Sequence, residues 1–423
     1  MGIVTGSLIA RLLGPEGRGV LAAIQNWPTL VVGFGTLGIP TAAAYFSGRD
    51  PTVAGRLLTT CLIALFLWSI PLITVTYVLM PLLLNAQSAS VIYQARVYLL
   101  IIPIQFAIGV PFWVLQGLRE FRLWNFLRLQ GPLAWLTVIV LAWTLHASTG
   151  EAVSFIYLII MAWVASIFMV VALWRVPSPH QLSFSRLPAL LQYGLPSILA
   201  NLPQLLNLRL DQLLIAAVLP AHTLGVYVVA VAWSGISSPL LTSVSQVIFP
   251  HLAATHDRQT QAETLQRTLR LSVLSVTVLT GLLLAVTPIF LPLLFGKAFV
   301  AAVPPAFVLI VAAGAAGINQ VASEGLRGLG VPKWPMVAEF VGLSITIILL
   351  VLLLRRYQLM GAAIASLFSY LGTLVTLVSL IGHQTQTSPW KIVIPRRQDL
   401  SFLWYQVYSF WPRLVSLLYY NRK

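Results

Sequence analysis

About twelve apolar stretches follow one another along the chain, and only short polar linkers separate them. An α-helix needs roughly 20 apolar residues to cross the ~30 Å hydrocarbon core of a bilayer, and a helix also satisfies its own backbone hydrogen bonds there. We therefore expect an all-α, polytopic membrane protein. The predicted spans are 1–13, 20–46, 57–84, 95–117, 123–145, 152–174, 188–218, 225–250, 270–294, 301–325, 334–354 and 360–381.

The composition indicates that lipid covers most of the surface. Of the 423 residues, 58% are hydrophobic and 8% are charged, and the mean hydropathy is +0.90. A soluble domain carries about 25% charged residues, so these few charges cannot cover a water-exposed surface. Because no linker is long enough to fold as a separate domain, the function must be carried out within or across the membrane.

The sequence lacks the motifs of common enzyme classes. It contains no GxxxxGK(S/T), GxSxG or HExxH pattern, and its six His residues have no metal-ligand spacing. The single cysteine, Cys61, cannot form a disulfide within the chain. We expect a protein that is not an enzyme, with no catalytic residue, no metal site and no cofactor.

The net charge of +15 has a topological explanation. The 25 Lys and Arg residues are spread over many linkers and do not form one basic stripe, so we exclude nucleic acid as a partner. Most of them fall in alternate linkers and in the C-terminal tail, which is typical of cytoplasmic loops. The pattern predicts that both termini lie in the cytoplasm and that the number of spans is even.

The chain contains an internal repeat. The segment LIARLLGPEGRGVLAAIQNW at 8–27 aligns without a gap with LIAAVLPAHTLGVYVVAVAW at 214–233, so that Gly19 matches Gly225 and Trp27 matches Trp233. A second pair, Gly-Leu-Arg at 117–119 and at 325–327, has nearly the same spacing. The spacing covers an even number of predicted spans, which implies parallel halves like those of many secondary transporters. The alternative is that short loops share Gly and Arg for independent reasons.

The repeat predicts the domain organisation. We expect an N-terminal six-helix bundle at 1–180, a C-terminal six-helix bundle at 181–385, and a central cavity between them. An aromatic-rich tail at 386–423 is predicted to lie at the cytoplasmic membrane interface. The range 1–13 would give a helix of only about 20 Å at 1.5 Å per residue, so we expect a truncated first helix or a late start.

The predicted span 188–218 carries the most informative polar residues. Placed on a helix, four of its side chains fall within about 120° of one another. These four are Asn201, Gln204, Asn207 and Asp211. Arg209 lies on the opposite side of Asn201 from the other three residues. Placing a charge inside a membrane costs free energy, and such a charge usually has a functional role.

We expect this polar half of the helix to line a substrate cavity. Arg209 would attract an anionic group, and Asp211 would tune that site or accept a proton. The alternative is structural: an ion pair between Arg209 and Asp211, with hydrogen bonds that hold neighbouring helices together. Pro196 and Pro203 predict a bend in this span, because proline removes a backbone hydrogen bond.

Several short motifs resemble bacterial lipid-linked oligosaccharide flippases of the O-antigen type, in the multidrug/oligosaccharidyl-lipid/polysaccharide exporter superfamily. Their order and spacing along the chain agree with this family. The motifs are IARLLGPE at 9–16 followed by Gly19, DQLLI at 211–215, GVY at 225–227, FP at 249–250, LFG at 294–296 and GLRG at 325–328. The resemblance covers residues 5–381.

The resemblance implies two six-helix bundles around a cavity that opens alternately to each side. It implies that a polyprenyl-pyrophosphate-linked oligosaccharide moves from the inner to the outer leaflet of the plasma (inner) membrane, for lipopolysaccharide or other surface polysaccharide. The implied partners are this lipid-linked oligosaccharide, membrane lipid and other polysaccharide-assembly membrane proteins. A cationic cavity would hold the pyrophosphate, and Arg209 and Arg11 are the matching residues.

Two other functions are alternatives to the flippase. A multidrug exporter of the same superfamily would share the fold, but its cavity would be more acidic to suit cationic cargo. A membrane-embedded glycan polymerase or ligase would need a large outer loop with catalytic residues, whereas the linkers here are short and the chain has 10 Asp and Glu residues in total.

Overall fold

The computed structural model describes residues 2–177, 179–255 and 257–396, and within these ranges the regular structure is helical. The predicted tail at 386–423 falls largely outside the described residues; its described part contains the short helix α16 (Pro389–Val393). The chain forms two compact units, each described here by itself. Unit 1 comprises Met1–Ser234, Val286–Leu309 and Leu343–Ser366, and unit 2 comprises Gly235–Ala285, Ile310–Gly342 and Leu367–Lys423.

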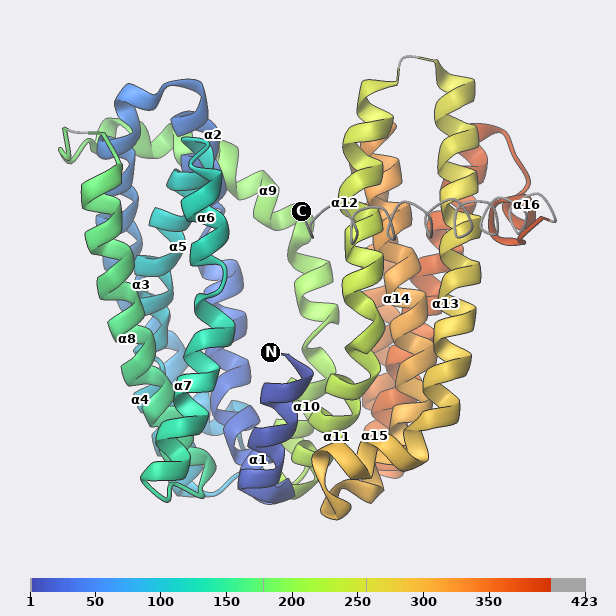
Figure 1. The fold of residues 1–423 in the computed structure, drawn as a ribbon, viewed down its shortest axis with the longest axis horizontal. Helices are drawn as coiled ribbons and strands as arrows, with labels where there is room; N and C mark the ends of the chain where they lie inside the picture. Colours follow the sequence, from blue (N-terminus) through green and yellow to red (C-terminus); the bar gives the residue numbers. More distant parts are fainter. Residues whose placement is uncertain (1, 178, 256, 397–423) are drawn as a thin grey trace, which may run out of the picture. The chain divides into compact units, whose positions relative to one another are not determined.

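The helices of unit 1 include the whole N-terminal part of the chain (Figure 1). They are α1 (Ile3–Gly35), α2 (Ile39–Arg49), α3 (Ala54–Leu83), α4 (Ala89–Tyr98), α5 (Ile101–Gly117), α6 (Phe121–Leu127), α7 (Gln130–Thr144), α8 (Gly150–Arg175), α9 (Leu187–Asn207), α10 (Leu210–Val218) and α11 (Ala221–Ser234). The last turns of α13 (Arg258–Phe295), the short helix η4 (Lys297–Ala302), the start of α14 (Val303–Gly328) and the middle of α15 (Lys333–Thr385) complete it.

The structure confirms a multi-pass membrane protein with long apolar helices. Eight described helical segments are long and apolar enough to cross a membrane, and the bent pair α1–α2 raises the number to nine. Two predicted spans, 334–354 and 360–381, lie in the single helix α15, which is kinked at Gln358. The predicted span 188–218 is divided between α9 and α10. The count of twelve spans in two bundles stays a prediction.

The kinks fall at the predicted linkers. Gln358 has a φ of 45°, and a Cβ on Gly361 would lie 2.5 Å from the carbonyl oxygen of Leu353. The chain therefore folds back on itself at Gln358, between the two predicted spans. In α1, Gly14 has a φ of 64°, a conformation that suits glycine, and it separates the predicted spans 1–13 and 20–46.

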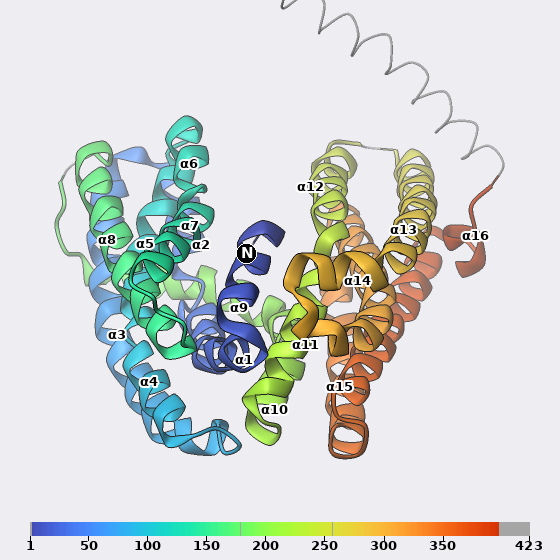
Figure 2. The same ribbon diagram turned by 60° about the horizontal axis from the view of Figure 1, so that its bottom comes forward.

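Helix α1 is the centre of unit 1. It packs along α11 and also contacts α4, α7 and α8 (Figures 1 and 2). Apolar side chains fill the space between α1, α7 and α8, because each of these helices is apolar on more than one face. The buried members of this cluster are Ile9, Leu13, Leu21, Val138, Ala142 and Val153.

The two copies of the repeat meet at a reciprocal contact between α1 and α11. A Cβ on Gly19 would lie 1.7 Å from the carbonyl oxygen of Ala221, and a Cβ on Gly225 would lie 1.9 Å from the carbonyl oxygen of Pro15. Pro15 and Ala221 are themselves matched positions in the sequence repeat. Only glycine permits this approach of two helix backbones, as at the small-residue contacts of other membrane helices.

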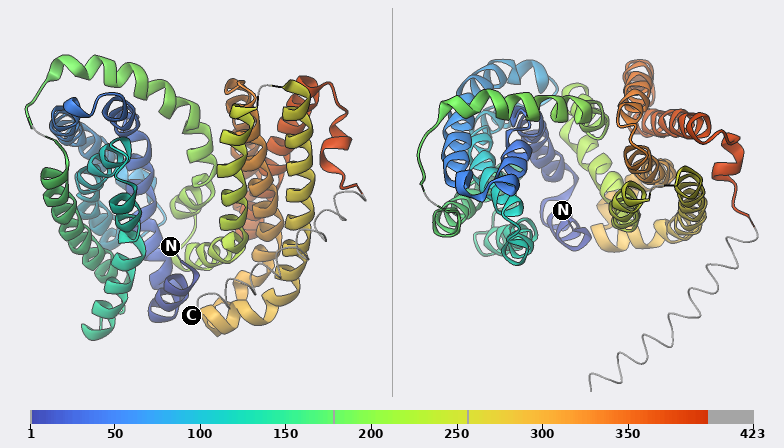
Figure 3. Two further views of the ribbon diagram at one scale, coloured as in Figure 1. Left: turned by 45° about the horizontal axis from the view of Figure 1, so that its top comes forward. Right: turned by 90° about the horizontal axis from the view of Figure 1, so that it is seen from above.

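Unit 2 is a bundle of long helices around its own apolar core. It contains α12 (Ser238–Ala254), the first part of α13, the later part of α14, both ends of α15, and α16. Figures 1 and 3 both show α12 and α13 running side by side. The core is formed by buried side chains from all five helices, among them Leu252, Leu265, Val321, Leu377 and Ile392.

Candidate functional site

The predicted polar span is broken within its polar part. Helix α9 ends at Asn207 and α10 begins at Leu210, with Arg209 between them at a non-helical φ of −130°. Both Pro196 and Pro203 lie inside α9 and do not end it, so the break comes later than the prolines predicted. Discontinuous helices are found at the substrate and ion sites of several transporters, because their ends leave backbone groups available.

Asp211 lies just after this break and is the centre of a buried hydrogen-bond network. The hydroxyl of Tyr227 in α11 donates to its Oδ2 at 2.7 Å, and the hydroxyl of Ser366 in α15 donates to the same oxygen at 3.4 Å. The backbone N–H of Gln212 donates to Oδ1 at 2.7 Å. Asp211 is 7% exposed and Tyr227 is fully buried. Such a buried carboxylate needs these donors, because an unpaired one would be strongly destabilising.

Two further buried hydrogen bonds join α1 and α15 to this region. Asn26 in α1 donates from Nδ2 to Oε1 of Gln212 at 3.3 Å. Thr346 in α15 donates from its hydroxyl to Oδ1 of Asn207 at 2.5 Å. These interactions tie the broken helix to α1, α11 and α15, and they fix the positions of its polar side chains.

The predicted residues Asn201, Gln204 and Arg209 are more open than Asn207 and Asp211. All three are half-buried, and Asn201 donates from Nδ2 to the carbonyl oxygen of Ser197 at 2.9 Å. Among the described residues, Arg209 and Asp211 do not form the ion pair of the structural alternative, since the partners of Asp211 are neutral donors. The guanidinium of Arg209 therefore acts on Asp211 through the attraction of their charges and not through a hydrogen bond.

Arg11 lies at a different place in unit 1. Its Nε donates to the carbonyl oxygen of Leu294 at 2.8 Å, and its Nη2 donates to the carbonyl oxygen of Leu293. These carbonyls belong to the last turn of α13, where a helix lacks its own donors and favours a positive charge. Arg11 thus stabilises a helix end, and the structure does not bring it into hydrogen-bonding contact with Asn201, Asn207 or Asp211 within the described part of the chain.

The sequence did not single out Tyr227, Ser366 or Thr346 as polar partners of the site. Tyr227 was visible only as part of the GVY motif, and its distance of 16 residues from Asp211 spans a helix break. Ser366 and Thr346 are ordinary hydroxyl residues of apolar spans, and nothing in their neighbourhood marks them. Asn26 lies within the predicted span 20–46, and nothing in the sequence indicates that it pairs with Gln212.

The arrangement offers two chemical functions. The half-buried guanidinium of Arg209 can bind a phosphate or carboxylate through its planar fork of donors. The carboxylate of Asp211 can gain or lose a proton, and either change would alter its bonds to Tyr227 and Ser366. The described residues contain no group of three His, Cys, Asp or Glu side chains that could hold a metal ion.

Comparisons with known proteins agree with this architecture. Residues 1–256 match the model of the family described as "Polysaccharide biosynthesis protein". This match covers more than half of the chain, and the protein belongs to that family. The comparison with curated proteins gives no match.

Solved structures show which fold the chain has. One is "Lipid II flippase MurJ, inward closed conformation", with a TM-score of 0.74, 15% identity, and coverage of 90% of this chain and 84% of that chain. An inward-facing multidrug resistance MATE family transporter of the MOP superfamily has a TM-score of 0.72 at 14% identity, covering 91% of this chain and 95% of that one. The eukaryotic MATE transporter AtDTX14 has a TM-score of 0.57 at 15% identity, covering 92% and 98%. The chain has the fold of these flippases and transporters.

Proposed function

We propose that the protein is a flippase for a polyprenyl-pyrophosphate-linked oligosaccharide. It would move this substrate from the inner to the outer leaflet of the plasma (inner) membrane by alternating access, for the synthesis of surface polysaccharide such as lipopolysaccharide. Membership of the polysaccharide biosynthesis protein family supports the pathway, and the fold supports transport. The observation that carries the proposal is the half-buried Arg209 at the break between α9 and α10.

Arg209 is the group that would bind the pyrophosphate. The hydrogen bonds of Asp211 come from neutral donors, so the N–H groups of Arg209 would be available to an anion, although the two charges attract each other through space. Asn201 and Gln204 lie on the preceding turns of α9 and are half-buried, which suits hydrogen bonds to sugar hydroxyls. Asn207 is buried and holds Thr346, so its contribution would be to shape the site. The contacts of Arg11 favour its helix-end role over the substrate role that the sequence predicted.

Asp211 is the group that would couple transport to an ion. Proton or cation exchange at this carboxylate would rearrange its bonds to Tyr227 and Ser366, which connect α10 to α11 and α15. A change at one side chain would then reach three helices. The alternative is that the membrane potential supplies the free energy for transport.

The topology completes the proposal. We infer twelve spans in two parallel halves, 1–180 and 181–385, with a central cavity, both termini in the cytoplasm and the tail 386–423 at the cytoplasmic interface. The reciprocal contact of Gly19 and Gly225 supports the parallel repeat. Membrane lipid and other polysaccharide-assembly membrane proteins are the proposed partners, and no cofactor is needed.

A multidrug exporter is the second candidate, because MATE transporters share the fold. Such an exporter binds cationic cargo best in an acidic cavity. Arg209 argues against cationic cargo, because its charge would repel the cargo at the break between α9 and α10.

Complementation of a bacterium that lacks its O-antigen flippase tests the proposal. The wild-type chain should restore surface polysaccharide, Arg209→Ala should abolish it, and Arg209→Lys should retain part of it. Arg175→Ala is the matched control, because Arg175 is an exposed arginine at the end of α8. Full activity of Arg209→Ala at equal amounts of folded protein would refute this role for Arg209. Export of a cationic dye without surface polysaccharide would favour the multidrug exporter.

A further inference from the structure

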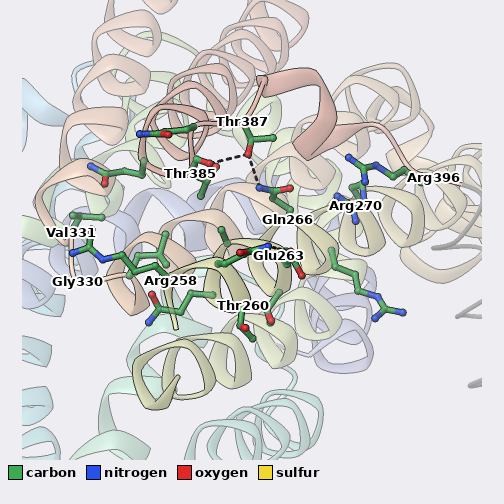
Figure 4. Close-up of a pocket in the computed structure, with 18 residues that line it drawn as sticks. Arg258, Thr260, Glu263, Gln266, Arg270, Gly330, Val331, Thr385, Thr387 and Arg396 are labelled. Carbon is green, nitrogen blue, oxygen red and sulfur yellow. Dashed lines mark hydrogen bonds between the residues drawn. The ribbon is translucent and has the colours of Figure 1, made fainter. Parts of the chain in front are cut away.

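Unit 2 contains a large polar pocket at the end where α13 begins and α15 ends. Its volume is about 1080 Å³. The first turns of α13, the turn between α14 and α15, the last residues of α15 and Arg396 form its walls (Figure 4). All of these residues belong to unit 2, whereas Asp211 and its partners belong to unit 1.

Arginine dominates the charge of this pocket. Among the described residues, its lining includes Arg258, Arg267, Arg270 and Arg396 and one carboxylate, that of Glu263. The oxygen Oε1 of Glu263 accepts a hydrogen bond from Nε2 of Gln259 at 3.1 Å. A pocket with this balance attracts anions, and the remaining lining is rich in amide and hydroxyl groups that can donate hydrogen bonds to them.

The carboxylate of Asp257 lies just before α13 and already accepts hydrogen bonds from that helix. The hydroxyl and the backbone N–H of Thr260 both donate to it, and these bonds hold the pKa of Asp257 below its usual range. Asp257 therefore remains ionised near neutral pH and stabilises the first turn of α13. It is not one of the residues that line the pocket.

The walls of the pocket are fixed by hydrogen bonds across unit 2. Nε2 of Gln266 donates to the hydroxyl of Thr387 at 3.0 Å, and the hydroxyl of Thr387 donates to the carbonyl oxygen of Thr385 at 3.0 Å (Figure 4). Arg270 is only 7% exposed and donates from Nη1 to the carbonyl oxygen of Lys391 at 3.3 Å. An arginine buried to this extent is held in place before a ligand arrives, which lowers the entropy lost on binding.

The neighbouring helix α16 indicates a membrane surface beside the pocket. Trp390 is 74% exposed, although the carbonyl oxygen of the next residue, Lys391, accepts a hydrogen bond from Arg270. Ile394, just after α16, is 57% exposed. Tryptophan concentrates at the level of the lipid headgroups, with its ring toward the acyl chains. These exposed side chains favour a position of the pocket near the lipid headgroups.

We propose that this pocket binds the phosphate-bearing headgroup of an anionic membrane lipid. Arginine suits such a ligand, because its planar guanidinium can donate two parallel hydrogen bonds to a phosphate. Basic pockets at the cytoplasmic ends of membrane helices are known to hold anionic headgroups, and the arginines of this pocket lie on the predicted cytoplasmic side. The phosphate can come from a bulk phospholipid or from a polyprenyl pyrophosphate, and the proposal does not depend on transport.

Lipid binding to the purified full chain in detergent tests the proposal. The probes are dioctanoyl phosphatidylglycerol, farnesyl pyrophosphate, dioctanoyl phosphatidylcholine and inorganic pyrophosphate, and the readouts are native mass spectrometry and the thermal unfolding midpoint. The pocket variant is Arg258→Gln/Arg267→Gln, because both arginines are exposed and folding should tolerate their loss. The matched control is Arg49→Gln/Arg175→Gln, which removes two exposed arginines elsewhere.

We expect phosphatidylglycerol or farnesyl pyrophosphate to bind the wild type and the control alike. The pocket variant should bind about tenfold more weakly, which corresponds to the loss of one strong interaction. Preference for phosphatidylglycerol would assign the site to bulk phospholipid, and preference for farnesyl pyrophosphate would assign it to a polyprenyl lipid. Equal binding by the pocket variant and the control, equal binding of phosphatidylcholine, or equal binding of free pyrophosphate would overturn the proposal.

Discussion

Gly19 and Gly225 occupy matched positions in the sequence repeat, and they contact each other where α1 crosses α11. A Cβ on Gly19 would lie 2.9 Å from the backbone nitrogen of Gly225, and a Cβ on Gly225 would lie 2.8 Å from that of Gly19. The neighbouring atoms are backbone, which cannot move aside as a side chain could. These two matched glycines therefore control how closely α1 and α11 pack.

Gly19→Ala and Gly225→Ala should each destabilise the protein. Overpacking a tight contact costs about 1–3 kcal/mol, and the backbone clash here places both variants at the upper end. The thermal unfolding midpoint of the purified protein should fall, together with the yield of folded protein. Gly6→Ala is the control on the same helix, because nothing lies within 4 Å of its Cβ. It should leave stability unchanged or raise it slightly, and equal loss in all three variants would contradict the prediction.

Tyr227→Phe should weaken the network around Asp211. It removes the 2.7 Å hydrogen bond to a buried carboxylate, which should cost about 1–3 kcal/mol of stability. Asp211→Asn should cost less in a Tyr227→Phe background than in the wild type, because the two side chains interact directly. A double-mutant cycle on the thermal unfolding free energy measures this coupling. Strictly additive effects would show that the hydrogen bond contributes nothing.

Arg11→Gln should reduce stability more than it reduces transport per folded molecule. Arg11 donates to the last carbonyls of α13, and a cation at a helix end contributes about 0.3–2 kcal/mol. Limited proteolysis and the unfolding midpoint report the first effect, and surface polysaccharide normalised to folded protein reports the second. Arg11→Lys should restore part of the stability. If Arg11→Gln abolished transport in a fully stable protein, the sequence-based assignment of Arg11 to the substrate would be favoured instead.

The matched tryptophans of the repeat should respond differently to substitution. Nε1 of Trp233 donates to the hydroxyl of Thr287 at 2.8 Å, whereas Nε1 of Trp27 has no hydrogen-bond partner among the described residues. Trp233→Phe should therefore cost about 1–3 kcal/mol beyond the loss of ring volume, because a buried polar partner loses one of its bonds. Trp27→Phe removes only volume and serves as the control. Unfolding midpoints of the two variants that agree within error would show that the Trp233 bond is dispensable.

Hydropathy predicted where most helices lie, because a membrane helix needs a long apolar run and this signal is local. The predicted linkers at 14–19 and 355–359 coincide with kinks in the structure, at Gly14 and Gln358. The break at Arg209 was not predicted. Proline pointed to an earlier position, but the hydrogen bonds lost at Pro196 and Pro203 did not end α9.

The polar site around Asp211 was only partly predictable, because the break between α9 and α10 was not predicted. Helical periodicity placed Asn207 and Asp211 on one face, and both are buried in polar contacts. Periodicity assumes an unbroken helix, however, so it could not indicate that Asp211 lies across a break from Asn207, or that Asn201 and Gln204 are more open than both. The partners Tyr227, Thr346 and Ser366 come from other helices, and a contact between distant helices leaves no trace in one sequence.

The reciprocal contact between α1 and α11 also bears on how such a chain could arise. In a homodimer of a half-length ancestor, a glycine on the symmetry axis would meet its own copy, so one mutation would disturb both sides of the interface at once. Gene fusion makes the two copies independent. After such a fusion, the close approach of the backbones would still require glycine at Gly19 and Gly225, whereas the matched positions Pro15 and Ala221 carry different residues. The fused chain could thus acquire an arginine and a carboxylate on one side alone, which a symmetric dimer could never do.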